Sequence, residues 1–335
     1  MTHIRKAVFP VAGMGTRFLP ATKSIPKEML PLVDRPLIQY AIDEAREAGI
    51  EEFIFVTAAG KGALEDYFDT AAALENRLAA GNRTKALAAL EGTRIPEGAL
   101  AFLRQNNPLG LGHAVRLASR LVGDEPFAVL LPDDVIRAPR GALSQMISAH
   151  ALQRGHMVAT MNVPQAETSS YGILDVANTE GRIAHARGLV EKPHPEQAPS
   201  TNAIVGRYIL EPSIFDRLAE LRPGSSGELQ LTDAISADLD STDVTGFRFE
   251  GERFDCGSIQ GFVQATVAFA MDRPELEGDL SAFLGRFTTP MRYAAQRLGA
   301  ARTCLAKIQT ARHGREVITT FISKDERVAR TRSWQ

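Results

Sequence analysis

Cysteine is almost absent from the sequence, since only Cys256 and Cys304 occur among 335 residues. Two cysteines imply neither a disulfide framework nor a cysteine zinc site. No apolar run approaches the roughly 20 residues that a membrane-spanning helix needs. The N-terminus, Met1–Lys6, leads straight into a strand pattern without the apolar segment of a secretory leader. We therefore expect no membrane insertion and a location in the cytoplasm.

Internal repeats and low-complexity tracts are also missing, including the hexapeptide β-helix repeat of some appended acyltransferase domains. The formal net charge is only −2, so the chain as a whole lacks the positive charge that binds nucleic acid. Charge is unevenly placed, however. Residues 286–335 contain 11 Lys and Arg but 3 Asp and Glu, a local net charge of +8 that leaves −10 on the rest. Composition therefore separates residues 1–285 from a basic extension, residues 286–335.

The first half of the chain alternates between apolar runs and helical periodicity. Buried strands are predicted at Ala7–Val11, Glu52–Thr57 and Phe127–Leu131, with a shorter one at Ala99–Leu103. Between them, the spacing of apolar residues predicts a helix from Pro36 to Gly49 and helical structure over residues 64–90, interrupted at Gly81–Asn82. Strands that alternate with helices are typical of an α/β fold with ligands at the carboxyl ends of its strands.

The second half has strand patterns with few helices between them, which predicts antiparallel pairs joined to the first sheet. These patterns lie at Met157–Met161, Gly172–Val176, Gly188–Glu191 and Ala203–Leu210. A helix is expected to begin at Glu228. Apolar residues recur at helical spacing from Met291 to Ile308, so the basic extension is expected to be partly helical. Two interpretations of it remain open, a docked amphipathic helix or a tail that recruits the protein to acidic surfaces.

A glycine-rich loop, Ala12–Arg17, follows the first strand. Small residues let a backbone approach a ligand closely, and a loop of this kind can direct several N–H groups at a phosphate. Arg17, Lys23 and Lys27 add three cations nearby. A dinucleotide fingerprint is excluded because Phe18 stands where its third glycine would be, and a P-loop is excluded because Thr16–Arg17 does not supply Gly-Lys-Ser/Thr. Taken alone, such a loop is as often a tight turn.

Acidic residues follow two apolar runs and could hold a metal ion. Asp133 and Asp134 come directly after Phe127–Leu131, and Asp255 follows Phe254. Mg²⁺ usually takes one or two carboxylates and completes its shell with water and phosphate oxygens. The alternative for each acid is a turn or helix cap. Glu191–Lys192 could bind a sugar hydroxyl and its phosphate, although such a pair is more often solvated at the surface.

The complete string GxGTRxxPxTxxxPKExLP, which begins at Gly13, resembles the signature of the sugar-phosphate nucleotidylyltransferases. Other strings resemble motifs of the same family: LPDD at 131–134, EKP at 191–193, AIVGRYIL at 203–210 and FDCGS at 254–258. RQNNPLGLGHA at 104–114 and GELQLTDAI at 227–235 resemble its uridylyltransferase branch. The resemblance covers about residues 5–285. It implies a Rossmann-like, three-layer α/β sandwich with a mixed, mostly parallel central sheet, a small antiparallel β subregion and a C-terminal helical extension.

The resemblance also implies a role for each residue that matches a family motif. Arg17, Lys27 and Lys192 would assist catalysis. The nucleotide would be bound by Ala12, Gly13, Gly15, Thr16, Glu28, Gln105, Gly110 and Asp134. The sugar phosphate would be bound by Gly172, Glu191, Lys192 and Val205, and the metal by Asp133 and Asp255. Asp133 is favoured over Asp134 for the metal. His113 and Cys256 are interpreted as packing residues without a catalytic role.

The reaction implied is the Mg²⁺-dependent transfer of a uridylyl group from UTP to glucose 1-phosphate, which gives UDP-glucose and pyrophosphate and serves polysaccharide biosynthesis. A homo-oligomer is expected. Three alternatives remain open. They are a thymidylyltransferase that uses dTTP, a weakly active regulatory paralogue, and a scaffold recruited through the basic extension. The presence of Lys27, Asp133, Lys192 and Asp255 argues against the regulatory paralogue.

Overall fold

The structure is a computed structural model that describes residues 3–224 and 227–288. Two compact units make up the chain, Met1–Ala270 and Met271–Gln335. The second unit includes helix α11 (Pro274–Thr288), in which the rings of Phe283 and Phe287 lie 4.9 Å apart. The predicted boundary between residues 285 and 286 falls within this helix. The helical pattern at residues 291–308 lies outside the described residues, so the partly helical structure of the basic extension stays a prediction.

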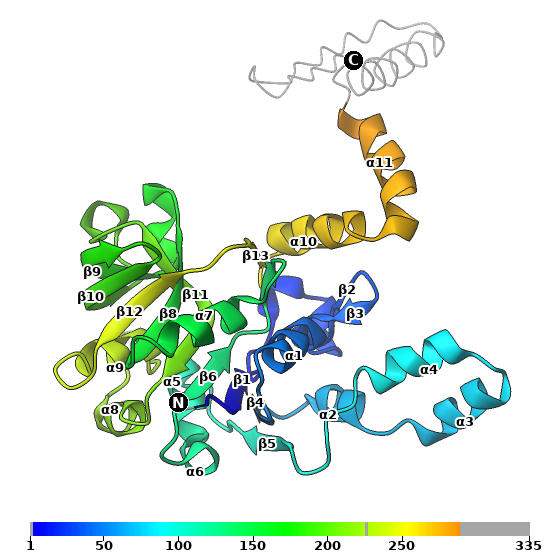
Figure 1. The fold of residues 1–335 in the computed structure, drawn as a ribbon, viewed down its shortest axis with the longest axis horizontal. Helices are drawn as coiled ribbons and strands as arrows, with labels where there is room; N and C mark the ends of the chain where they lie inside the picture. The colour runs from blue at the N-terminus through cyan, green and yellow to red at the C-terminus, as the bar shows by residue number, and fades with distance from the viewer. Residues whose placement is uncertain (1–2, 225–226, 289–335) are drawn as a thin grey trace, which may run out of the picture. The chain divides into compact units, whose positions relative to one another are not determined.

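Within the described residues, the first unit contains one sheet of nine strands (Figure 1). In sheet order, these strands are β5 (Leu100–Arg104), β4 (Glu52–Thr57), β1 (Lys6–Pro10), β6 (Phe127–Leu130), β11 (Asn202–Leu210), β8 (His156–Asn162), β12 (Val244–Arg248), β10 (Ile183–Glu191) and β9 (Gly172–Glu180). Every strand predicted from an apolar run is present, although β10 begins at Ile183 rather than Gly188. The sequence did not predict β12.

The sheet is mixed, as predicted, but parallel pairing is confined to two parts of it. β5, β4, β1 and β6 are parallel neighbours, and so are β8 and β12. The other neighbours are antiparallel, which corrects the expectation that parallel pairing predominates. The reason is that parallel neighbours need a crossover connection, whereas β9 and β10 follow each other through a tight turn at Gly181 (φ +61°). Two register shifts between His185 and Gly188 then bend β10 along its length.

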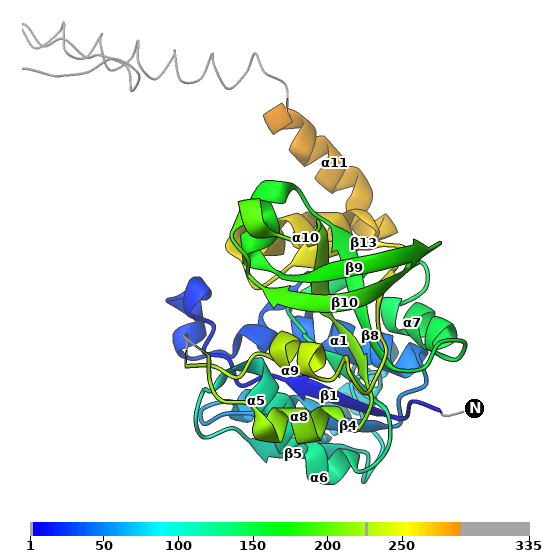
Figure 2. The ribbon, with the colours of Figure 1, turned by 90° about the vertical axis from the view of Figure 1, so that its left-hand side faces the viewer.

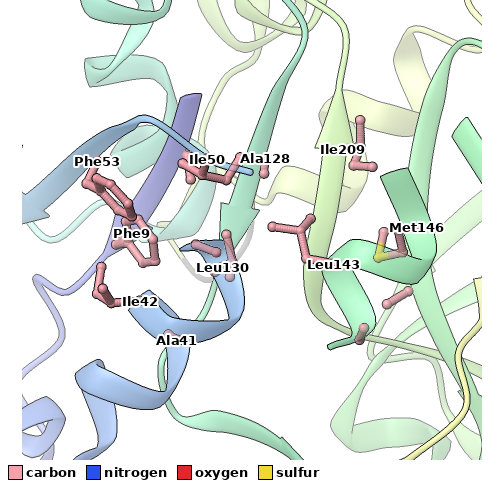
Figure 3. Close-up of a cluster of buried hydrophobic side chains, with 14 of the residues drawn as sticks. Phe9, Ala41, Ile42, Ile50, Phe53, Ala128, Leu130, Leu143, Met146 and Ile209 are labelled. Carbon is pink, nitrogen blue, oxygen red and sulfur yellow. The ribbon is translucent and has the colours of Figure 1, made fainter. Parts of the chain in front are cut away.

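Helices pack against the sheet through two separate hydrophobic clusters, because successive strand residues face opposite sides. The cluster that contains Phe9 includes residues of α1 (Leu37–Glu47), α2 (Gly62–Phe68) and α7 (Ala142–His150). Figure 3 shows this cluster, with Phe9 and Phe53 beside Ile42. The cluster that contains Val8 includes residues of α5 (Gly110–Leu117), α6 (Ser119–Val122), α8 (Ile214–Glu220) and α9 (Leu231–Ala237). α5, α8 and α9 contact one another on this side (Figure 2).

The remaining elements are short or lie outside the two clusters. The helical stretch predicted over residues 64–90 forms α2, α3 (Ala72–Ala80) and α4 (Thr84–Glu91), with a break between α2 and α3 that the sequence did not predict. In the described part of the chain, the other elements are β2 (Pro31–Leu32), β3 (Arg35–Pro36), β7 (Asp134–Arg137), β13 (Glu252–Asp255), α10 (Ile259–Met271) and five 3₁₀ helices at Thr16–Phe18, Ala21–Lys23, Lys27–Met29, Gln165–Ser170 and Pro195–Gln197. None of the described helices is long and apolar enough to span a membrane.

A buried ion pair connects the sheet to α1. Arg207 of β11 is 1% exposed, and its Nε and Nη2 donate to the carboxylate of Glu44 at 2.8–3.1 Å. Its guanidinium also donates to the carbonyl oxygens of Leu131, Asp134 and Gly206. Glu44 in turn accepts a hydrogen bond from the Leu143 amide at the start of α7, at 2.9 Å. One ion pair therefore joins two helices, a central strand and the turn that follows β6.

A second buried polar cluster, formed by His156 and Asp238, is expected to make folding depend on pH. His156 is fully buried, and its Nε2 lies 2.9 Å from Asp238 Oδ2. Burial lowers the pKa of His156 below its ordinary value of 6.5, although Asp238 opposes the shift. The unfolded chain therefore binds a proton at a higher pH than the folded chain does. Stability that is complete above pH 6.5 should consequently decline as the pH falls toward the folded-state pKa, with a slope of at most about 1.4 kcal/mol per pH unit from this residue.

We expect this slope to become flatter in His156→Gln, which keeps a side-chain N–H donor but does not titrate. The measurement is the free energy of unfolding in urea at several pH values between 5 and 8, for both proteins. The comparison uses slopes, so a uniform loss of stability in the variant does not affect it. Equal slopes in the two proteins would show that His156 does not carry this pH dependence.

Candidate functional site

The loop after β1 folds back over the segment that carries Lys27. Gly15 has φ +65°, a left-handed conformation that glycine adopts without steric cost. A side chain at Gly15 would come within 3.0 Å of Lys27 Cβ and 3.2 Å of Thr22 Cγ2. The Thr22 hydroxyl also donates to the Gly15 carbonyl at 2.7 Å. The small residue predicted for close approach to a ligand therefore also brings the loop close to a cation.

Lys27 forms an ion pair with Asp133, the first acid after β6. Lys27 Nζ lies 2.5 Å from Asp133 Oδ2. Burial alone would lower the pKa of Lys27, but the carboxylates of Asp133 and Glu28 outweigh it and raise that pKa. Burial would raise the pKa of Asp133, but the charge and hydrogen bond of Lys27 outweigh it and lower that pKa. Both groups are therefore charged at neutral pH.

The motifs LPDD and FDCGS, which contain the predicted metal ligands, meet at a two-stranded ribbon that the sequence did not predict. β7 pairs with β13 in antiparallel register, with Asp134 opposite Asp255. A side chain added at Gly257 would lie 2.9 Å from Asp133 Oδ2 and 3.0 Å from Asp255 Oδ1. The carboxylates of Asp133 and Asp255 therefore border one small space. Cys256, which follows Asp255, is fully buried, and burial raises the pKa of its thiol to about 12, in agreement with a packing role.

Asp134 differs from Asp133 because protein groups contact both of its carboxylate oxygens. Arg253 Nε donates to Asp134 Oδ1 at 2.6 Å, with a second contact from Arg253 Nη2 to the same oxygen. The Gly206 amide donates to Oδ2 at 2.6 Å. The side chain of Asp134 is 9% exposed, against 26% for Asp133. Asp134 therefore joins β7 to β11 and β13, while Asp133 keeps the more accessible carboxylate.

Glu191, the last residue of β10, contacts the first turn of α9, and Lys192 follows it in the chain. Lys192 Nζ lies 3.2 Å from Glu191 Oε1, and the Thr232 hydroxyl donates to Glu191 Oε2 at 2.9 Å. Lys192 adopts φ +45°, which costs a non-glycine residue about 1 kcal/mol or more. A side chain at Gly172 would come within 2.7 Å of Thr232 Cγ2 and 3.2 Å of Glu191 Oε2. The position of the Glu191 carboxylate therefore depends on the hydrogen bond from the Thr232 hydroxyl and on the absence of a side chain at Gly172.

Gln105 and Glu28, both expected to bind the nucleotide, are buried side chains. Glu28 is 1% exposed and accepts a hydrogen bond from Lys61 Nζ at 2.7 Å, and its other oxygen has no partner in the described part of the chain. Burial raises the pKa of Glu28, although the charges of Lys61 and Lys27 oppose the shift. Gln105 Nε2 donates to the Gly110 carbonyl at 3.2 Å.

An open cavity of about 500 Å³ is bordered by many of the residues described above, and its size is typical of small-molecule sites. The predicted site residues that line it are Arg17, Gly110, Asp133, Asp134, Gly172, Glu191, Lys192, Val205 and Asp255. Lys27 and Gln105 do not line it but contact Asp133 and Gly110, which do. The other predicted residues outside the lining are Ala12, Gly13, Gly15, Thr16 and Glu28.

The lining residues that were not predicted as functional include Tyr171, Thr232 and Arg253. Arg253 Nη1 donates to the Tyr171 hydroxyl at 3.2 Å, and the guanidinium carbon lies 5.5 Å from the ring centroid. Arg253 therefore connects Asp134 to the residue that precedes Gly172. Thr232 and Arg253 lie in or beside GELQLTDAI and FDCGS, but a motif alone does not indicate which of its side chains faces a cavity.

The sequence of this chain is similar to those of known proteins. A sequence profile of the family described as "Nucleotidyl transferase" matches residues 6–271. A protein of Komagataeibacter xylinus named UTP--glucose-1-phosphate uridylyltransferase is 50% identical over 255 residues, which are 76% of this chain and 90% of that protein. A protein of the same name from Bacillus subtilis is 45% identical over 285 residues, 85% of this chain and 97% of that protein.

Solved structures resemble the fold as well. A crystal structure of UDP-glucose pyrophosphorylase complexed with UDP-glucose superimposes with a TM-score of 0.72 at 42% sequence identity. The superposition covers 81% of this chain and 100% of that one. The family profile, which matches residues 6–271, spans every residue that lines the cavity.

Proposed function

The chain belongs to the nucleotidyl transferase family, and from this premise we propose that it transfers a uridylyl group from UTP to glucose 1-phosphate. The products are UDP-glucose and pyrophosphate. The observation that carries the proposal is a single cavity lined by Asp133, Asp255, Glu191 and Lys192, in a chain 43–50% identical to uridylyltransferases of that name. We interpret the two helical clusters and the mixed sheet as three layers, and we expect the protein to act in the cytoplasm.

The reaction requires little covalent work from the protein. A phosphate oxygen of glucose 1-phosphate forms a bond to the α-phosphorus of UTP, and the bond to the β-phosphate oxygen breaks and releases pyrophosphate. The attacking oxygen is already anionic near neutral pH, so no general base is needed. Catalysis then depends on orienting two anions and compensating their charge.

Three cationic side chains, Lys192, Arg17 and Lys27, are placed where they could orient the two substrates and compensate their charge. Lys192, at the end of β10 and 56% exposed, would hold the phosphate of the sugar while Glu191 accepts hydrogen bonds from sugar hydroxyls. Arg17 lines the same cavity, and Lys27 lies behind Asp133. Arg17 and Lys27 would neutralise the triphosphate, together with the N–H groups of the loop around Gly15.

The residues present also suit a magnesium ion. Asp133 and Asp255 border one space, and among the described residues no group of three or more His, Cys, Asp or Glu side chains could hold a metal. Two carboxylates with water and phosphate oxygens are the usual shell of Mg²⁺. A bound Mg²⁺ would neutralise charge on the phosphates. We propose Asp133 rather than Asp134 as its ligand, because Asp134 is engaged by Arg253 and Gly206.

The test is the release of pyrophosphate by the full chain with Mg²⁺ and glucose 1-phosphate, using UTP, dTTP, GTP and ATP in turn. The expected result is a clear preference for UTP in the wild type and a large loss of turnover, with every nucleotide, in Lys192→Ala. A preference for dTTP would instead place the protein among thymidylyltransferases. No release with any nucleotide would favour the regulatory paralogue, and the proposal would be wrong.

A smaller effect is expected at Thr232, which is 5% exposed and donates to Glu191. Thr232→Val keeps the shape of the side chain and removes its hydroxyl. Loss of one hydrogen bond to a charged group should raise KM for glucose 1-phosphate about 5- to 20-fold, with a small change in KM for UTP. Thr232→Ser, which retains the hydroxyl, is the matched control and should stay close to the wild type. A valine variant with an unchanged KM would show that Glu191 is positioned without this bond.

A further inference from the structure

Gln105 lies at a fixed place beside the cavity. It follows the last residue of β5, and its backbone N–H donates to the Thr57 carbonyl at the end of β4, at 2.7 Å. The residue is 7% exposed. The parallel pairing of β4 with β5 ends at Thr57 and Arg104, so this bond continues the ladder by one residue. The backbone of Gln105 is therefore held by the sheet itself.

The amide of Gln105 has a defined orientation. Its Nε2 lies 3.2 Å from the Gly110 carbonyl and 2.9 Å from His113 Nδ1. A carbonyl oxygen can only accept, so the atom that faces Gly110 must be the amide nitrogen. Both N–H groups of the amide are then used within the protein. The remaining atom, Oε1, accepts no hydrogen bond from the described residues and is not sealed from solvent.

His113 must accept a hydrogen bond at Nδ1 for this arrangement to hold. The imidazole is then neutral, with its proton on Nε2. Burial lowers the pKa of His113, the charge of Arg116 lowers it further, and the Asn107 backbone opposes the shift. The neutral form is therefore the favoured one at physiological pH.

The first turn of α5, which carries His113, is itself locked in place. Leu229 donates its N–H to the Leu109 carbonyl at 2.7 Å and accepts from the Gly112 amide at 2.8 Å. A side chain at Gly110 would come within 2.8 Å of Glu228 Cβ, and one at Gly112 within 2.7 Å of the Leu229 carbonyl. The helix therefore cannot shift easily to give Gln105 a different partner.

We propose that His113 is a positioning residue that makes the site select uracil over cytosine. By accepting from Gln105 Nε2, it keeps Gln105 Oε1 presented as an acceptor. Uracil has an N3–H donor for that oxygen, whereas N3 of cytosine is an acceptor and would face it unpaired. Reversing the amide would direct Oε1 at the Gly110 carbonyl and at His113 Nδ1, so cytosine cannot be accommodated by a simple flip.

This inference rests on the proposed function and adds the basis of its choice of base. Thymine has the same N3–H as uracil, so dTTP serves as an internal control. The two variants to compare are His113→Phe, which keeps a ring but removes the acceptor, and His113→Asn, whose Oδ1 can occupy the place of Nδ1. Each is made in the full chain, and pyrophosphate release with glucose 1-phosphate gives kcat/KM for UTP, CTP and dTTP.

We expect the ratio of kcat/KM for UTP to that for CTP to fall about tenfold or more in His113→Phe. The same ratio should remain near the wild-type value in His113→Asn, and the ratio for UTP to dTTP should change little in either variant. An active His113→Phe with an unchanged UTP-to-CTP ratio would overturn the inference and leave the proposed function intact. If His113→Phe does not fold, as judged by its thermal melt, His113→Leu replaces it with the same expected result.

Discussion

Replacing Asp133 by asparagine is expected to lower kcat/KM for UTP by about 10²- to 10³-fold, the scale of losing one preorganised electrostatic contact in a catalytic site. The substitution hardly alters size but removes the charge that faces Asp255 across Gly257. It also removes the anionic partner of Lys27, whose Nζ lies 2.5 Å from Asp133 Oδ2. Freed from that partner, the lysine would reorient toward the substrate phosphates or the remaining acids. Two of the proposed requirements, Mg²⁺ binding and the placement of a cation, therefore depend on one carboxylate.

The assay is pyrophosphate release across a range of Mg²⁺ concentrations, with a thermal melt to verify folding. We expect the Mg²⁺ concentration needed for half-maximal rate to rise in Asp133→Asn. Glu252→Gln is the matched control, because Glu252 is an acid on the same ribbon whose side chain is 59% exposed and pairs with Arg137 instead. It should behave as the wild type. If Asp133→Asn keeps a rate within threefold of the wild type, Asp133 is not the metal ligand that we propose.

Arg207→Met should destabilise the fold by about 3–5 kcal/mol, the usual result of removing one partner of a buried ion pair. The methionine fills a similar volume, so the loss comes mainly from the carboxylate of Glu44, which is left buried with the Leu143 amide as its remaining partner among the contacts described above. The carbonyls of Leu131, Asp134 and Gly206 lose a donor as well. Because these carbonyls flank Asp133, activity should fall in the fraction of protein that remains folded.

Urea unfolding of Arg207→Met, Glu44→Gln and the double variant measures this effect. The double variant should lose less stability than the sum of the single variants, because removing both charges leaves none unpaired. Arg5→Met is the control, since Arg5 forms exposed pairs with Glu51 and Glu52 and should change stability by less than about 1 kcal/mol. A loss of similar size in Arg5→Met and Arg207→Met would mean that burial does not strengthen the pair at Arg207.

The sequence predicts those parts of the fold in which local pattern and final structure agree. Apolar runs such as Phe127–Leu131 indicate strands because their side chains enter hydrophobic clusters on both faces of the sheet, and β6 is buried throughout. The antiparallel nature of the second half also follows from the short spacing between its strands. The β7–β13 ribbon could not be predicted. Each of its strands has four residues, the two lie more than a hundred residues apart, and neither has a clear alternation.

The candidate site could also be predicted from the sequence only in part. Asp133, Glu191 and Lys192 are indicated by motifs that lie at strand ends, and the cavity brings them together. Thr232 and His113 stand in comparable motifs, yet their importance comes from single hydrogen bonds to Glu191 and Gln105. The sequence does not indicate these bonds, because each of them joins two segments that only the fold brings together. The string LPDD likewise does not reveal that Arg253 and Gly206 engage the second acid and not the first.

The segment from Glu228 to Thr232 contacts both ends of the cavity. Leu229 pairs with Leu109 and Gly112 beside Gln105, and three residues later Thr232 holds Glu191. A displacement of this segment at either end is passed to the other through a few covalent bonds. We therefore expect the binding free energies of the nucleotide and of the sugar phosphate to be thermodynamically coupled. Substitutions at Gly112 and Thr232 should accordingly give non-additive changes, so each substrate's affinity has meaning only at a stated concentration of the other.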